Sequence, residues 1–73
     1  MNDADAKLAA LASEVSTLAD AYSETDDERD SREIADRIAD KYTAAIALVP
    51  TDDVRRLYLV SAHRVWADRA AAE

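Results

Sequence analysis

The chain of 73 residues contains no glycine and only one proline, and this constrains its fold more than any other feature. Hairpin turns that need a positive φ are excluded, because glycine supplies that conformation. Phosphate-binding loops, dinucleotide-binding turns and EF-hand calcium loops need glycine as well. Alanine alone fills seventeen positions, and with leucine and arginine it favours helix. We therefore expect an all-α protein.

Length and charge narrow the class further. Seventy-three residues suffice for one domain, and sixteen acids against nine bases give a formal net charge of −7. The absence of cysteine excludes disulfides and thiolate metal sites. The preference for aspartate and arginine over glutamate and lysine is typical of a GC-rich genome, such as that of an actinobacterium, its phages or a halophilic archaeon. No basic leader with an apolar run and no apolar stretch of about 20 residues occurs, so we expect a cytoplasmic protein without a membrane span.

Apolar residues at spacings of 3 and 4 predict three helices, over residues 3–22, 26–49 and 52–71. Thr25, with Glu28 three positions later, fits a capping box at the start of the second helix. Pro50 ends that helix, and Thr51 fits the N-cap of the third. The seam of the first helix consists of Leu8, Leu11, Val15, Leu18 and Tyr22.

These helices predict a three-helix bundle, formed by a helical hairpin and a third helix, in a single domain over residues 1–73. The apolar arc of the third helix is wider than two neighbouring helices would cover, and the run 57–60 in its N-terminal half is apolar almost all round the helix. We therefore expect a homodimer to complete or extend the bundle. The alternative is an extended helical hairpin that closes its core only as a dimer.

No residue pattern indicates an enzyme, a metal site or a cofactor. His63 is the single histidine, so it has no histidine or cysteine partners for a metal ion, and we interpret it as a surface residue. The acids over 26–30 are explained by the start of a helix, where the dipole favours negative charge. We expect neither catalytic residues nor bound cofactors.

One strip on the third helix combines tryptophan and arginine, the residue types most enriched in binding hot spots. We predict that this strip is a partner or dimer interface, although Trp66 also suits one end of the core. The strip consists of Arg55, Leu59, Ala62, Trp66 and Arg69.

These features favour a non-enzymatic protein-interaction module, a small regulator or adaptor of bacterial or phage type that acts through a helical face. The alternative is a nucleic-acid-linked regulator, either a DNA mimic through its acidic surface or a weak DNA binder through the arginines of the third helix. The net charge of −7 argues against direct binding, because phosphate neutralisation dominates DNA affinity.

Overall fold

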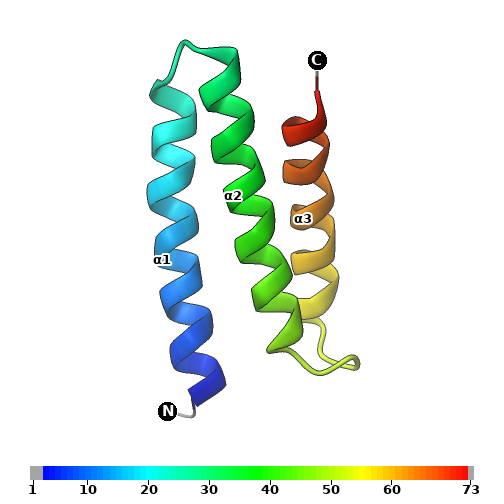
Figure 1. Ribbon diagram of the computed structural model, residues 1–73. Helices are drawn as coiled ribbons and strands as arrows, with labels where there is room; N and C mark the ends of the chain where they lie inside the picture. The colour runs from blue at the N-terminus through cyan, green and yellow to red at the C-terminus, as the bar shows by residue number, and fades with distance from the viewer. Residues whose placement is uncertain (1–2, 73) are drawn as a thin grey trace.

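A computed structural model describes residues 3–72, and these residues form three helices and no strand: α1 (Asp3–Glu24), α2 (Glu28–Ala47) and α3 (Arg55–Ala71). The helices run alternately up and down and are joined by two short connections (Figure 1). The all-α three-helix bundle expected from the spacing of apolar residues is therefore confirmed.

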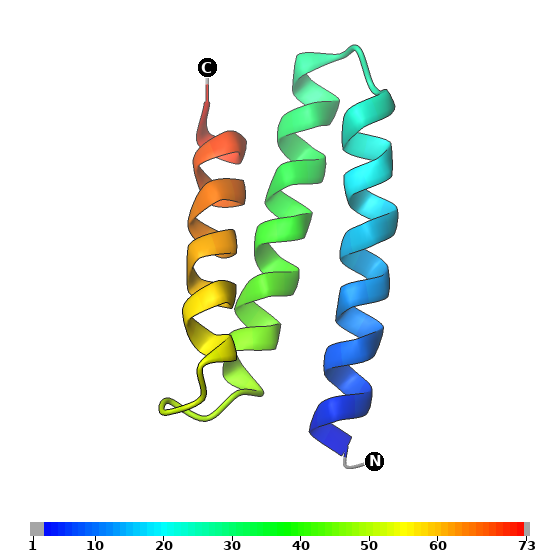
Figure 2. The same cartoon turned by 180° about the vertical axis from the view of Figure 1, so that it is seen from behind.

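The second helix lies between the other two and carries most of the core (Figure 2). Ile38 has no exposed surface and is the largest fully buried side chain. Neither α1 nor α3 contains a buried residue, and they meet through side chains rather than through close backbone packing. The second helix is thus the most buried of the three. The buried residues are Ala35, Ile38, Ala39, Ala45 and Val49.

The arrangement is more open than that of a compact domain of this size. It measures 38 × 20 × 13 Å, and its radius of gyration of 12.7 Å exceeds the value of about 11 Å expected for this length. Its accessible surface of 5181 Å² is about 700 Å² larger than that of a typical monomer of 8.0 kDa. Apolar surface therefore remains outside the core.

The start of α2 differs from the prediction. Asp27, not Thr25, is the N-cap, and its carboxylate accepts hydrogen bonds from the backbone N–H groups of Arg29 (2.8 Å) and Asp30 (3.1 Å). The Thr25 hydroxyl instead accepts one from the N–H of Asp27 at 3.3 Å. A carboxylate that satisfies two free donors and faces the positive end of the helix dipole outcompetes a hydroxyl two residues earlier. The prediction of Thr25 as cap was wrong.

The connection between α2 and α3 is also longer than expected. The third helix begins at Arg55 rather than at 52, and Thr51 lies in a turn instead of capping it. Val54 is the N-cap of α3 and makes no side-chain capping bond. The carboxylate of Asp53, one residue earlier, accepts a hydrogen bond from the N–H of Arg55 at 2.9 Å. The N–H of Asp53 donates to the carbonyl of Pro50 at 3.1 Å, which closes the turn.

Candidate functional site

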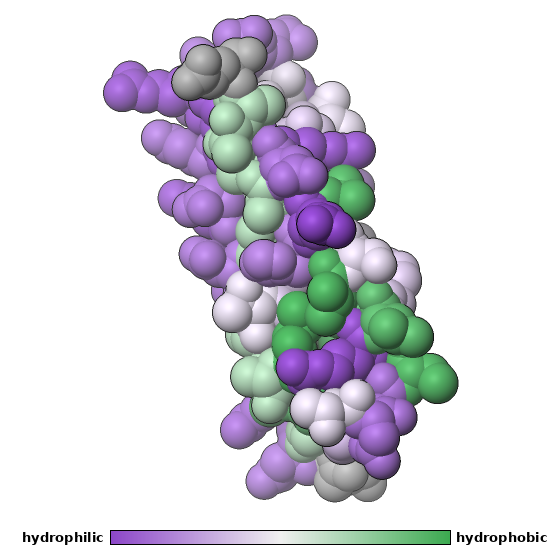
Figure 3. All heavy atoms as spheres, turned by 90° about the vertical axis from the view of Figure 1, so that its right-hand side faces the viewer, coloured by the Kyte–Doolittle hydropathy of each residue, from purple (hydrophilic) through white to green (hydrophobic). Residues whose placement is uncertain are grey.

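The main feature of the surface is an apolar stripe on α3, which we call the outer face. Its members recur at spacings of 3 and 4, so they lie on one side of the helix. Figure 3 shows strongly hydrophobic residues gathered over the lower part of the molecule on the side of α3. Val54, which directly precedes the helix, is 80% exposed, Leu57 74% and Tyr58 67%. The outer face comprises Val54, Leu57, Tyr58, Ser61 and Val65.

Charge around the outer face is nearly balanced. The third helix carries four arginines and one aspartate, which gives +3, whereas the remainder carries five bases and fifteen acids, which gives −10. Three of the arginines are engaged within the chain, as described below. Arg64 and Asp68, both exposed, are the charged residues on the outward side of the helix. The outer face is thus an apolar stripe with a small, neutral polar edge.

The strip predicted as an interface lies on the neighbouring side of α3, which faces α1. Leu59, Ala62 and Trp66 are half-buried. The Trp66 ring meets Tyr22 of α1 edge to face, with centroids 5.1 Å apart. The Arg69 guanidinium lies 4.6 Å from the Trp66 centroid and 5.6 Å from that of Tyr22. These contacts join α1 to α3 within one chain, and the dimer role of the strip stays a prediction.

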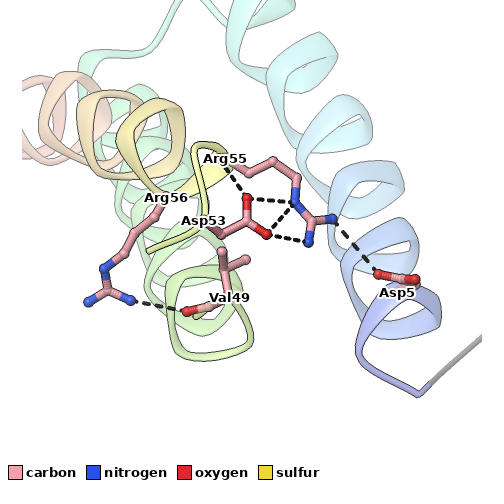
Figure 4. Close-up of polar contacts among 5 residues, drawn as sticks. All are labelled: Asp5, Val49, Asp53, Arg55 and Arg56. Carbon is pink, nitrogen blue, oxygen red and sulfur yellow. Dashed lines mark hydrogen bonds and ion pairs between the residues drawn. The ribbon is translucent and has the colours of Figure 1, made fainter. Parts of the chain in front are cut away.

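Arg55, the remaining member of the strip, ties the start of α3 to its own turn and to α1 (Figure 4). Its Nη2 lies 2.8 Å and its Nε 3.1–3.2 Å from the carboxylate oxygens of Asp53, and its Nη1 lies 3.8 Å from Asp5 Oδ1. The hydrogen bonds from Arg55 hold the pKa of Asp53 below its ordinary value. This contact stabilises the fold above the ordinary aspartate pKa and is lost as acid protonates Asp53.

Arg56 binds backbone carbonyl groups at the end of α2. Its Nη1 donates to the backbone carbonyls of Ile46 and Val49, both at 3.2 Å, and the side chain is half-buried. The last carbonyls of a helix lack partners within the helix, and a cation suits the negative end of its dipole. Arg56 therefore closes the C-terminus of α2, and Figure 4 shows its bond to Val49.

An apolar groove of about 500 Å³ runs between α1 and α3 with α2 as its floor. The groove exists because α1 and α3 each pack against α2 but do not pack closely against each other. Tyr58 of the outer face also lines the groove, so the two apolar surfaces are continuous. The other apolar lining includes Leu8, Leu11, Val15, Tyr42, Val49 and Leu59.

No family model, curated protein or solved structure matches this chain.

We also inspected His63, possible metal-ligand clusters and possible membrane spans. His63 is half-buried and lines a shallow surface hollow with Arg64 and Asp68. Over residues 3–72, no three side chains of the metal-ligating types gather at one point. Within the same range, none of the helices has the length and apolar character to cross a bilayer.

We expect the protein to lose stability at alkaline pH because of Tyr42, which lies on the floor of the groove. Burial raises its pKa above the ordinary 10.0, and a hydrogen bond with Tyr58 raises it further. A raised folded-state pKa stabilises the fold below pH 10.0, and this contribution is lost as the pH rises through the folded value. We expect the melting temperature to fall between about pH 9 and about pH 12, and to fall less in Tyr42→Phe. Tyr22→Phe is the matched control, and an equal decline in both variants would contradict this assignment.

The sequence pattern contained a signal for the outer face that the interface prediction did not use. Val54, Leu57, Ser61 and Val65 recur at spacings of 3 and 4, as Leu59, Ala62 and Trp66 do on the other side. Periodicity cannot decide which of two apolar sides of one helix faces a neighbour. The contacts of Trp66 and Arg56 decide it here, since both turn toward the other helices.

Proposed function

We propose that this protein is a non-enzymatic protein-interaction module that binds through the outer face of α3. The observation that carries the proposal is the position of the large exposed apolar residues. Every exposed large hydrophobic of the described chain lies on α3 or directly before it, whereas α1 and α2 present charged residues to solvent. Contiguous apolar patches of this kind mark interaction surfaces in soluble proteins.

The chemistry of the outer face supports a protein as partner. Interface centres are apolar and contain aromatic residues, and their rims are polar. Tyr58 supplies an aromatic ring beside Leu57 and Val65, and Arg64 with Asp68 supplies the rim. A helical face of this type meets another helix through residues spaced by 3 and 4. The partner surface is therefore an apolar stripe on a helix.

The nucleic-acid alternative draws less support from the arrangement of the arginines. Arg55 pairs with Asp53 and Asp5, Arg56 binds backbone carbonyls, and Arg69 lies on the rings of Tyr22 and Trp66. Arg64 is left as the arginine of α3 directed outward. A phosphate-binding helix needs several free cations, so no observation favours direct DNA binding over protein binding.

The test compares proteins retained by immobilised wild type, by Leu57→Asp and by Val60→Asp. Leu57 lies in the outer face, whereas Val60 is 48% exposed on the same helix but outside the stripe. The proposal expects one defined protein, either a tagged second copy of this chain or another protein, to be retained by wild type and Val60→Asp and lost with Leu57→Asp. Retention that is equal for all three, or absent for all three, would overturn it.

A further inference from the structure

The chain exposes more surface than a typical monomer of its mass, by an amount comparable to what one partner of a stable dimer buries. The accessible surface exceeds that of a typical monomer of this mass by about 700 Å². A specific interface of standard size buries about 800 Å² on each partner. The excess accessible surface is therefore close to the area that one partner buries in such an interface. Most of the large apolar side chains that are exposed lie on the outer face.

Charge restricts which surface of this chain can meet a second copy. Two chains of −7 repel each other, and a contact through α1, which carries five acids and one base, would bring acid against acid. The α2 helix carries five acids and four bases, and it exposes no large apolar side chain that a second copy could cover. The outer face avoids this repulsion, because Arg64 and Asp68 balance each other and the other arginines of α3 are engaged within the chain. The outer face therefore combines neutral charge with exposed large apolar side chains, so a second copy of the same acidic chain can approach it.

The order of residues along the outer face also fits a two-fold axis. Ser61, a small residue, lies midway between Leu57 and Val65, four positions from each. When two α3 helices cross antiparallel at Ser61, Leu57 of one copy faces Val65 of the second copy. Asp68 then lies near the N-terminus of the opposite helix, where the dipole favours an anion. A parallel pair would place Arg64 against Arg64 and Asp68 against Asp68.

We infer that the partner of the outer face is a second copy of this chain, with the two α3 helices antiparallel and the two-fold axis at Ser61. This inference rests on the proposed function and names its partner. Each copy presents the same patch, as a two-fold symmetric interface requires. Trp66 remains in contact with Tyr22 inside each copy, so the interface does not require its exposure.

Light scattering at micromolar concentration tests the assembly. Wild type and Val60→Asp should have twice the chain mass of 8.0 kDa, and Leu57→Asp should have the mass of one chain while circular dichroism stays helical. Leu57 is 74% exposed, so the aspartate is compatible with the folded chain. A monomeric wild type would overturn the inference, as would a Leu57→Asp variant that remains dimeric.

Cross-linking tests the register, because the natural chain has no cysteine. Ser61→Cys should form an intermolecular disulfide on mild oxidation. Leu57→Cys and Val65→Cys should cross-link when mixed and not when each is oxidised alone, because a disulfide needs Cα atoms within about 7 Å. Cross-linking of each variant with itself would indicate a parallel pair and overturn the antiparallel arrangement.

The retention experiment separates the failure of this inference from the failure of the proposed function. A monomeric wild type that retains another protein through Leu57 would refute the dimer and leave the interaction module in place. A wild type that retains neither its own copy nor another protein through Leu57 would refute both.

Discussion

Replacing Ile38 by alanine is expected to lower the free energy of unfolding by about 2–5 kcal/mol. Ile38 is the largest side chain without exposed surface, and α2 packs against both other helices. Its truncation therefore removes apolar contacts at the centre of the molecule and leaves a cavity. In a domain of this size each kcal/mol shifts the melting temperature by about 4–8 °C.

Ile34→Ala is the matched control, since Ile34 is the same residue type on the same helix but only half-buried. Thermal unfolding followed by circular dichroism at one fixed protein concentration measures both variants. Ile34→Ala should lose clearly less stability than Ile38→Ala. Equal losses would mean that the core is not centred on Ile38.

The second large effect is expected for Arg56→Ala, which should lower the free energy of unfolding by about 1–3 kcal/mol. The substitution removes the guanidinium donor from the carbonyls of Ile46 and Val49 in a half-buried position. Ile46 keeps the N–H of Val49 as a donor at 3.2 Å, so the carbonyl of Val49 is the more affected acceptor. Removing one partner from a shielded hydrogen bond costs more than removing an exposed charge.

Arg37→Ala serves as the control, because Arg37 is exposed on α2. Arg37→Ala should change the urea midpoint little, whereas Arg56→Lys should recover part of the lost stability by retaining a cation near the helix end. Urea unfolding, monitored by the fluorescence of Trp66, measures the stability of all three variants. If Arg56→Ala unfolds at the same midpoint as Arg37→Ala, the contact with the carbonyls does not stabilise α2.

Much of the fold followed from local patterns. The spacing of apolar residues gave three helices, and Pro50 marked the second connection. The helix ends were less accurate, because Thr25 and Asp27 both fit an N-cap and only the actual hydrogen bonds decide between them. The start of α3 moved to Arg55 for a similar reason, since Asp53 bonds both the backbone and the side chain of that arginine.

The candidate site depended on information that local patterns lack. The sequence correctly indicated that α3 is apolar over a wide arc, and it singled out the side that contains Leu59 and Trp66. The rotation of α3 about its axis is set by contacts between residues far apart in the chain, such as Tyr22 with Trp66 and Arg56 with Ile46. These pairs do not share a period, so no helical wheel could place them together.

The central position of α2 has a consequence for how the chain reaches its folded state. The molecule consists of two helical hairpins that share one helix, and helix pairs in close contact are consecutive in the chain. Each hairpin therefore closes through a short connection, and little loop-closure entropy separates the unfolded chain from its first native contacts. Topologies of this local kind fold in microseconds to milliseconds. A chain without glycine can thus reach its structure quickly, with its connections formed by hydrogen bonds of Asp27 and Asp53 and by one proline.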